Sequence, residues 1–306
     1  MRKASAFSPA HVTGFFQICD KPENPLYKGS KGAGFSIKNG VKTTVKIRDA
    51  EKTSVKVKIN NCIVENAEVS KKVVNLFLNK FHPKQSYEIL IEHEIAVPIG
   101  MGFGTSGAGA LSLALALNEA LKLGLSKIEA AQIAHIAEVE CKTGLGTVIA
   151  ETFGGIEIRT KPGAPGIGEV KNIEPDGNYI VASVFFGSSS TKKALTNAEI
   201  RRKINAVGEK LTSRLLKNPT VKNFMVLSRI FAEETGLISE RARKVLDELD
   251  RNGISGSIPI FGDAVFTLIP YNLVKDVEKV FAKYSDDKNN FLISGIDFEG
   301  AKLING

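Results

Sequence analysis

Residues 98–109 combine alternating glycines with hydroxyl side chains, directly before an Ala- and Leu-rich stretch. They read Pro98-Ile-Gly-Met-Gly-Phe-Gly-Thr-Ser-Gly-Ala-Gly109. Since Ala and Leu favour helices, the loop is predicted to lead into a helix over residues 108–121. The free N–H groups and positive dipole end of a helix bind anions, and glycine lets the backbone approach them closely. The loop is therefore predicted to bind a phosphate, with Thr105 or Ser106 either capping the helix or reaching a phosphate-bound Mg²⁺.

Two other phosphate-binding patterns fit this loop less well. Gly102 to Gly107 matches the dinucleotide pattern G-x-G-x-x-G, which requires a second strand and an acidic residue about 20 residues further on. The acid at that distance, Glu129, lies inside a second helical pattern over residues 126–141. The Walker pattern is absent because no lysine follows Gly107. A plain glycine-rich helix cap is the structural alternative, although a cap needs only one glycine.

A carboxylate and a second glycine turn follow further along the chain. Glu138 falls near the end of the nearly all-apolar helix predicted over residues 126–141. A carboxylate in such surroundings is costly unless it is paired or binds a cation. Glu138 is therefore a candidate Mg²⁺ ligand, and exposure at the helix end is the alternative. The turn over residues 142–148, which contains Gly144, Gly146 and Thr147, is a second site ready for an anion.

Polar residues near the N-terminus are candidates for a substrate pocket. His11 and Thr13 stand among apolar neighbours in a segment, residues 4–19, that reads as an interrupted strand. They need partners if they are buried, and satisfied core groups are the alternative. Residues 29–34 read as a glycine turn around Ser30, either a tight hairpin or a substrate contact. Thr191 and Lys192 stand at a predicted helix start, where they could cap the helix or bind an anion.

These segments must be positioned by a mixed α+β fold. Alternating lysines over residues 41–59 indicate two half-buried strands with one solvated face, predicted to form a hairpin around residues 49–52. Helices are predicted over residues 69–79, 108–121, 126–141, 194–217, 220–250 (broken near Gly236) and 275–284, and strands over 86–97, 179–186 and 290–293. The Pro- and Gly-rich residues 162–168 mark a boundary between a predicted nucleotide-binding domain, 1–168, and a C-terminal domain, 169–306.

Composition restricts the class of protein. The 306 residues are 43% hydrophobic and 24% charged, which is ordinary for a soluble globular protein. No signal peptide or membrane-spanning stretch is evident, and three widely spaced cysteines fit a reducing compartment, so a cytoplasmic location is expected. The net charge of +8 is dispersed along the chain. Solvated lysines explain this charge better than a nucleic-acid surface, and an anionic small-molecule substrate is compatible with it. A homodimer is possible.

The glycine loop resembles the P-x-x-x-G-L-G-S-S-A-A signature of the GHMP kinases. Phe103 stands for the usual Leu, Thr105 for the first Ser and Gly107 for the first Ala. Residues 9–16, 29–34, 134–146 and 165–168 look like the archaeal pantoate kinases of that superfamily, and the resemblance runs from about residue 4 to residue 268. It implies a two-domain α+β fold that uses ATP and Mg²⁺ to phosphorylate the hydroxyl of a small hydroxy acid. Pantoate, converted to 4-phosphopantoate for coenzyme A synthesis, is the expected acceptor.

The resemblance also implies roles for individual residues. Ser106 and Glu138 would hold Mg²⁺ and, with Thr147, form the catalytic group. The residues expected to bind ATP are Pro98, Gly100, Gly102, Phe103, Gly104, Thr105, Ser106 and Gly107, and those expected to face the acceptor are His11, Thr13, Ser30, Gly144 and Gly146.

Two positions depart from the family pattern. Thr147 stands where relatives carry an Asp that could accept the proton of the acceptor. The third family motif is normally glycine-rich, whereas here Ser257 is followed by Ile258, Pro259 and Ile260. Positioning and electrostatics can carry phosphoryl transfer without a base. The alternatives are a kinase of a phosphorylated mevalonate (mevalonate 3-phosphate 5-kinase type) and a catalytically inactive nucleotide-binding homologue.

Overall fold

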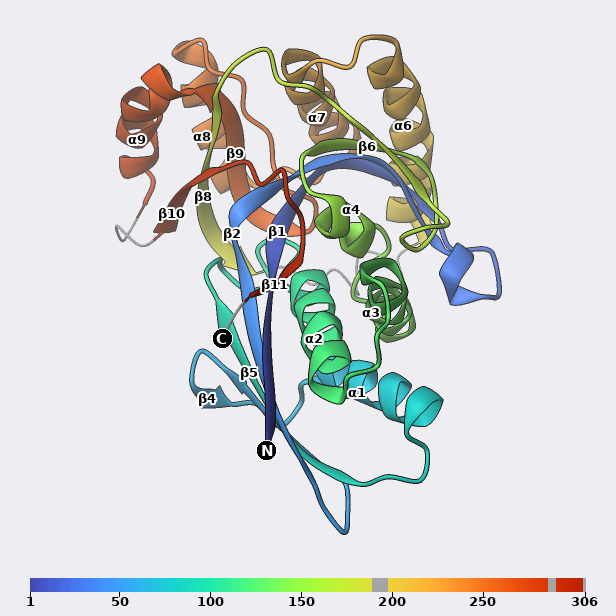
Figure 1. The fold of residues 1–306 in the computed structure, drawn as a ribbon. Helices are drawn as coiled ribbons and strands as arrows, with labels where there is room; N and C mark the ends of the chain where they lie inside the picture. Colours follow the sequence, from blue (N-terminus) through green and yellow to red (C-terminus); the bar gives the residue numbers. More distant parts are fainter. Residues whose placement is uncertain (189–197, 286–289, 305–306) are drawn as a thin grey trace.

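The computed structural model describes residues 1–188, 198–285 and 290–304 (Figure 1). Thr191, Lys192 and the helix start predicted at residue 194 lie outside these described residues. The strands are β1 (Arg2–Cys19), β2 (Gly29–Asp49), β3 (Ser54–Ile59), β4 (Cys62–Ile63), β5 (Tyr87–Ile95), β6 (Ile156–Lys161), β7 (Glu169–Asn172), β8 (Tyr179–Ser188), β9 (Gly262–Pro270), β10 (Phe291–Gly295) and β11 (Lys302–Ile304). The helices are α1 (Glu68–Phe81), α2 (Thr105–Leu121), α3 (Lys127–Cys141), α4 (Thr147–Phe153), α6 (Ala198–Lys217), α7 (Val221–Thr235), α8 (Glu240–Arg251) and α9 (Val274–Ala282), with short 3₁₀ turns at Pro25–Tyr27 and Tyr271–Leu273.

Two sheets organise the described chain. The larger has the strand order β11-β1-β2-β5-β3-β4, with β6 and β7 attached beside β2, and the smaller has the order β10-β8-β9. The long strands β1 and β2 run through the molecule, with α2 packed against their lower half and α1 and α3 packed on α2 (Figure 1). Their upper half packs with α6, α7 and the smaller sheet, and α8 and α9 cover the other face of that sheet. The predicted mixed α+β fold is confirmed.

The predicted hairpin of residues 41–59 is wrong. Strand β5 lies between the two lysine-rich strands, antiparallel to β2 and parallel to β3. Lys46 on β2 and Lys58 on β3 both donate to Glu92 on β5, at 2.7 and 3.3 Å. Parallel neighbours require a crossover connection, which α1 supplies between β3 and β5. The alternation of apolar and polar residues identified the buried face of each strand and could not identify its neighbour.

Residues 29–34 form the start of β2 and not a turn. Glycine is required there by the close approach of β1, because a Cβ on Gly34 would lie 2.5 Å from His11 Nε2. Strand β1 is continuous, and its pairing with β2 shifts register between Pro9 and Ala10 and between Thr13 and Phe15. Such bulges re-aim side chains, and here they flank His11 and Thr13, which both line a cavity described below.

The division at residue 168 stays a prediction. Strand β7 follows that position and β11 lies near the C-terminus, yet both join the large sheet, β7 beside β6 and β11 beside β1. The helix predicted over residues 220–250 is broken as expected, since Gly236 at φ 70° ends α7 before α8 begins. None of the helices among the described residues combines the length and apolar character that a membrane crossing requires.

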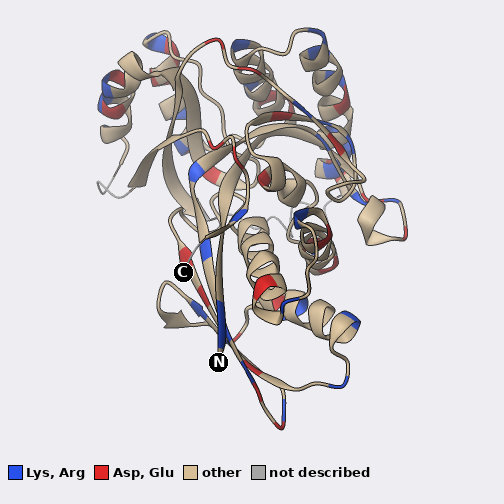
Figure 2. Cartoon of the chain, viewed as in Figure 1, with Lys and Arg blue, Asp and Glu red and all other residues tan. Residues whose placement is uncertain are grey.

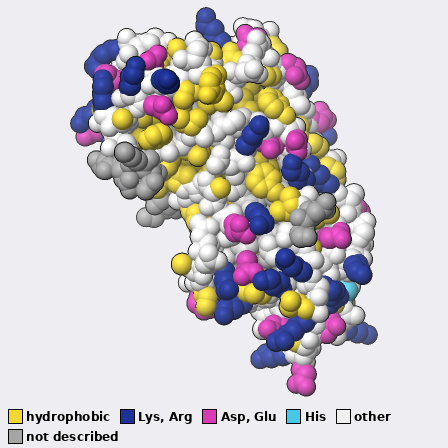
Figure 3. All heavy atoms as spheres, turned by 60° about the vertical axis from the view of Figure 1, so that its left-hand side comes forward, with side chains coloured by type: hydrophobic (Ala, Val, Ile, Leu, Met, Phe, Trp, Pro, Cys, Tyr) yellow, Lys and Arg dark blue, Asp and Glu magenta, His cyan; other side chains and the backbone are white. Residues whose placement is uncertain are grey.

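Charged side chains of both signs are interspersed over the molecule (Figure 2). On the face that Figure 3 shows, hydrophobic side chains gather on the upper part and the lower part carries mixed Lys, Arg, Asp and Glu. Some of the charges in the described chain are paired across strands, as Lys42 is with Glu94, and others within helices, as Arg229 is with Glu233. The charge is thus dispersed over strands and helices alike.

A buried polar network ties α1 and α2 to the sheet. His93 on β5 is 4% exposed; its Nδ1 lies 2.7 Å from Thr43 Oγ1, and its Nε2 lies 3.0 Å from Ser70 Oγ. Thr43 also bonds Ser112 of α2 at 2.6 Å. Burial lowers the pKa of His93 to about 4, so the imidazole is neutral in the folded protein above that pH.

We expect this histidine to make the protein acid-sensitive. Between pH 6.5 and about 4 the unfolded chain protonates His93 and the folded chain does not. The free energy of unfolding therefore decreases as the pH is lowered through this range, by about 3 kcal/mol in total. Urea unfolding of the wild type and of His93→Gln at pH 4.5, 5.5 and 6.5 checks this. The stability difference between the two proteins should shrink as the pH falls. A difference that stays constant from pH 6.5 to pH 4.5 would contradict the assignment.

Candidate active site

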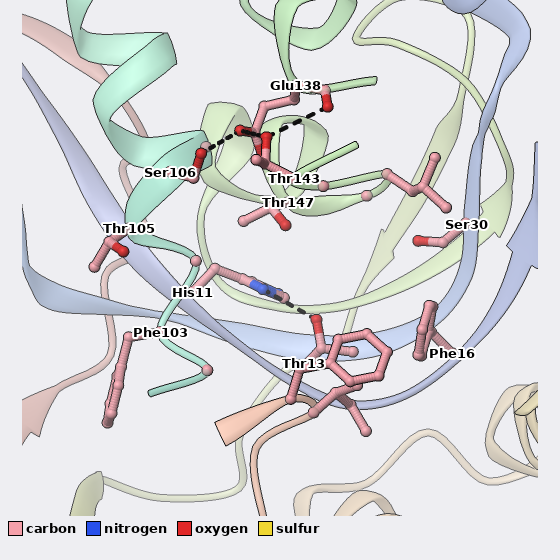
Figure 4. A pocket seen from close by; sticks show the side chains of 18 of the residues that line it. His11, Thr13, Phe16, Ser30, Phe103, Thr105, Ser106, Glu138, Thr143 and Thr147 are labelled. Atoms are coloured by element: carbon pink, nitrogen blue, oxygen red, sulfur yellow. Dashed lines mark hydrogen bonds between the residues drawn. The ribbon is translucent and has the colours of Figure 1, made fainter. Parts of the chain in front are cut away.

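A cavity of about 340 Å³ opens between the glycine loop, the N-terminus of α2, strands β1 and β2, and the turn over residues 143–147 (Figure 4). The predicted site residues that line it are His11, Thr13, Ser30, Gly100, Gly102, Phe103, Gly104, Thr105, Ser106, Gly107, Glu138, Gly144, Gly146 and Thr147. Pro98 is absent from this lining, and Ile99 takes part in its place. Segments far apart in the sequence thus meet at one cavity, and their individual roles remain predictions.

The glycine loop delivers an uncapped helix end to the cavity. Neither Thr105 nor Ser106 caps α2; the N-cap residue is Gly104, at φ 64° in the left-handed region, and no side chain bonds the first turn. Glycine is required at this position because a Cβ would lie 2.8 Å from Glu151 Oε1. The predicted hydroxyl cap is therefore wrong, since Ser106 bonds a carboxylate instead. The N–H groups at the start of α2 remain available to an anion.

Glu138 stands beside this helix end and is only 2% exposed, so the alternative of exposure at the helix end is wrong. Its Oε1 accepts hydrogen bonds from Ser106 Oγ and Thr143 Oγ1, both at 2.5 Å (Figure 4). Burial raises the pKa of Glu138, and the two hydroxyl donors act in the opposite direction. A carboxylate and a hydroxyl are oxygen donors of the kind Mg²⁺ prefers, and Mg²⁺ beside phosphates commonly uses one or two carboxylates. The residues present therefore fit that ion.

Glu151 is a second buried carboxyl that the sequence analysis missed. It lies on α4, fully buried, and neither of its oxygens has a hydrogen-bond partner. The carboxyl packs against the glycine loop, since a Cβ on Gly104 would lie 2.8 Å from its Oε1 and a Cβ on Gly107 would lie 2.9 Å from its Oε2. Burial raises the pKa of Glu151 well above its usual range, and the charges of Glu138 and Glu157 act in the same direction. The signal was present in the sequence, since Glu151 interrupts an apolar run as Glu138 does.

We expect Glu151 to make stability fall as the pH rises. Above about pH 4.5 the unfolded chain releases this proton while the folded chain still holds it, so a rise in pH favours the unfolded state. Glu151→Gln cannot ionise, so its stability relative to the wild type should be higher at pH 8 than at pH 5. Urea unfolding midpoints across this range measure the difference. The exposed carboxylate of Glu119 on α2 provides the control, and equal slopes for Glu119→Gln and Glu151→Gln would refute the expectation.

A buried charged cluster contributes His11 and Arg159 to the lining of the cavity. His11 Nε2 lies 3.0 Å from Glu157 Oε1, and the same oxygen accepts a short hydrogen bond from the Arg159 guanidinium. All three side chains are 1% exposed, and Arg159 Nε has no protein partner. Arg159 lines the cavity next to Gly146 and Ser30. Arg159 was not predicted from the sequence, although Glu157 and Arg159 alternate with Ile156 and Ile158 on β6 and were a visible signal.

Comparison with known proteins places the chain in a class. The sequence profile described as "GHMP kinases N terminal domain" matches residues 68–155, which include the glycine loop and Glu138. A pantoate kinase of Methanocaldococcus jannaschii is 39% identical over 270 residues, which cover 88% of this chain and 94% of the relative. The chain therefore belongs to the GHMP kinase family.

Solved structures agree with this assignment. A chain described as "Phosphotransferase related to CoA biosynthesis pathway" matches with a TM-score of 0.87 and 33% identity, over 98% of both chains. Mevalonate diphosphate decarboxylase of Staphylococcus aureus matches with a TM-score of 0.76, over 99% of this chain and 98% of the other. At 14% identity that second likeness shows a shared fold alone. The protein is a GHMP-type small-molecule kinase that depends on ATP.

Proposed function

We propose that this kinase transfers the γ-phosphoryl group of ATP to the primary hydroxyl of pantoate, a step that serves coenzyme A synthesis. The observation that carries the proposal is a single cavity lined by two groups that attract anions. One is the uncapped N-terminus of α2, and the other is the buried guanidinium of Arg159. The names of the similar proteins, a pantoate kinase and a phosphotransferase related to coenzyme A biosynthesis, support this acceptor and pathway.

The α2 end suits the nucleotide phosphates. Backbone N–H groups from Gly104 to Gly107 bind the phosphate oxygens in this proposal, with help from the helix dipole. Ser106 and Glu138 are the residues that would hold Mg²⁺. When bound, that ion would neutralise charge that develops on the transferring phosphoryl group. Glu138 is kept in place for this task by the hydroxyls of Ser106 and Thr143.

The Arg159 end suits the carboxylate of the acceptor. Arginine binds carboxylates through paired N–H donors, and burial strengthens such a contact. Among the described residues that line the cavity, Arg159 is the only Lys or Arg, and Glu157 already balances part of its charge. A phosphorylated mevalonate would bring a carboxylate and a phosphate to this one cation. The charge of the described lining therefore favours pantoate, which carries a single carboxylate.

The reaction needs little proton chemistry from the protein. The hydroxyl oxygen of the acceptor bonds to the γ-phosphorus while the bond to the bridging oxygen of ADP breaks, and the hydroxyl proton passes to the transferred phosphoryl oxygens or to water. Phosphoryl transfer passes through a loose transition state, in which positioning and charge stabilisation dominate. Thr147 lines the cavity and cannot act as a base near neutral pH. We therefore assign Thr147 a packing role, with its methyl group against Gly104.

ADP release with a panel of acceptors tests the proposal. Saturable release with Mg-ATP and pantoate, and none with mevalonate 3-phosphate, is the expected result. Release with mevalonate 3-phosphate alone would move the protein to the alternative acceptor. Binding of ATP without release for either acceptor would support the inactive homologue.

The location of the enzyme in the cell, its oligomeric state, its partners and its domain division are proposed from the sequence. We propose that it works in the cytoplasm on a small molecule, in keeping with three free cysteines at residues 19, 62 and 141. A homodimer and the lack of a nucleic-acid partner stay predictions, as does the division at residue 168.

A further inference from the structure

The third family motif, which departs from its usual glycine-rich composition, forms part of the cavity wall. Ile260 and Phe261 line the cavity from one side, and Phe16 of β1 lines it beside them. The rings of Phe16 and Phe261 meet edge to face, with centroids 5.8 Å apart and planes at 89°. We call these three residues, Phe16, Ile260 and Phe261, the apolar wall. It stands in a cavity whose remaining lining is mostly glycine and polar residues.

The backbone at Phe261 is strained. Its φ of 62° is in the left-handed region, where a bulky residue is an outlier and Gly or Asn would be relaxed. Strain of this kind persists where the surrounding structure fixes it, and it clusters at functional sites. A hydrophobic core alone does not require an aromatic residue in this conformation. The position of the Phe261 ring on the cavity therefore needs a functional reason.

Close contacts fix the strained turn between the phosphate loop and β1. Pro259 packs against Gly102, where a Cβ would lie 2.7 Å from Pro259 Cβ, and a Cβ on Gly262 would lie 2.2 Å from Met101 O. On the other side, Ile260 N donates to Thr13 O at 3.3 Å. Behind the wall, Phe16 is supported by Phe231 of α7, with ring centroids 6.3 Å apart. The apolar wall is therefore rigidly placed relative to the glycine loop.

The wall adjoins both the glycine loop and the strand that carries Arg159. The turn with Ile260 and Phe261 packs on the glycine loop, and Phe16 pairs with Gly32 of β2, whose partner on the other side is Arg159 of β6. An acceptor with its hydroxyl at the phosphate end and its carboxylate at Arg159 therefore presents its central carbon to this wall. In pantoate that carbon is quaternary and carries two methyl groups.

We infer that the apolar wall selects acceptors that carry a dimethylated carbon between the hydroxyl and the carboxylate. This inference rests on the proposed function, because it assumes that pantoate is the acceptor. Two methyl groups that leave water for a rigid apolar surface discriminate by roughly 10- to 200-fold. The same surface disfavours an acceptor that would place a charged phosphate against it, since an unpaired charge in apolar surroundings is costly.

The test compares pantoate with 2,4-dihydroxybutanoate, which has the same carboxylate and hydroxyls and lacks the two methyl groups. The wild type should prefer pantoate in kcat/KM by at least about tenfold. Phe261→Asn and Phe261→Gly both tolerate the positive φ, so both should fold. Each should lower kcat/KM for pantoate about tenfold more than kcat/KM for 2,4-dihydroxybutanoate, because only pantoate has the methyl groups that the lost ring would contact.

Matched controls separate the outcomes. Tyr271→Ala removes an aromatic ring that is 74% exposed and outside the cavity, and should change neither value. The affinity for Mg-ATP should be unchanged in every variant. The role of the wall would be overturned if the wild type used pantoate and 2,4-dihydroxybutanoate with equal kcat/KM. It would also be overturned if the Phe261 variants lost kcat/KM by the same factor for both acceptors. In both cases the proposed function would stand. Lack of any pantoate turnover by the wild type would overturn the proposed function, and the role of the wall with it.

Discussion

Glu138→Gln should lower kcat with Mg-ATP and pantoate by roughly 100-fold. Glutamine keeps the size of the side chain and removes the negative charge. Transition-state charge stabilisation is the main contribution of the protein to phosphoryl transfer, and loss of one well-placed group typically costs 10²–10³ in rate. Glu138 is the carboxylate that Ser106 and Thr143 hold at the N-terminus of α2. Steady-state kinetics at saturating pantoate measures the effect.

The matched control lies on the same helix. Glu140→Gln changes an exposed glutamate that pairs with Lys72, and it should leave kcat near the wild-type value. Ser106→Ala should also lower kcat, by more than roughly tenfold, because its hydroxyl binds the same carboxylate. Thermal melting checks that each variant is folded. A Glu138→Gln protein with kcat within threefold of the wild type would remove our assignment of the metal-binding site.

Arg159→Gln should act on the other substrate, raising KM for pantoate by roughly 100-fold with little change in the affinity for ATP. Loss of one partner of a buried, hydrogen-bonded charge pair costs about 2–5 kcal/mol. Because Arg159 also pairs with Glu157 inside the protein, its removal alone would leave a buried charge unpaired. The variant is therefore best made together with Glu157→Gln, and the two kinetic constants are measured by varying pantoate at saturating ATP.

Glu157→Gln alone is the reference for that double variant. It keeps the guanidinium in the cavity, and KM for pantoate should stay within about threefold of the wild-type value, because the acceptor contact remains. If the double variant and Glu157→Gln have the same KM, the acceptor carboxylate binds elsewhere and Arg159 serves only to neutralise Glu157.

Local signals made part of this site predictable. The glycine loop, the helix that follows it and Glu138 could be predicted because each depends on residues adjacent in sequence. A carboxylate in an apolar run requires a partner wherever the helix lies. The cap of α2 could not be predicted correctly, because Ser106 has two available partners. It bonds Glu138, 32 residues away, and only tertiary structure places that partner beside it.

Long-range pairing accounts for what could not be predicted. The neighbours of β3 depend on the crossover through α1, and the alternation of lysines along β3 carries no information about it. Arg159 becomes a cavity residue only because β6 pairs with the start of β2, next to Ser30. The departure of the third family motif at Ile260 was visible in the sequence, but the apolar wall that it forms was not. The wall depends on contacts with Thr13 O and Phe16, which β1 contributes from the other end of the chain.

The most direct test of the central claim is the phosphorus NMR spectrum of the product formed from pantoate and Mg-ATP. Transfer to the primary hydroxyl predicts a new phosphomonoester resonance, split into a triplet by the two methylene protons at C4, together with an equal amount of ADP. A doublet would place the phosphate on the C2 hydroxyl and reverse the orientation of the acceptor between Arg159 and the glycine loop. Release of inorganic phosphate with no new ester would contradict the assignment of this protein as a pantoate-phosphorylating kinase.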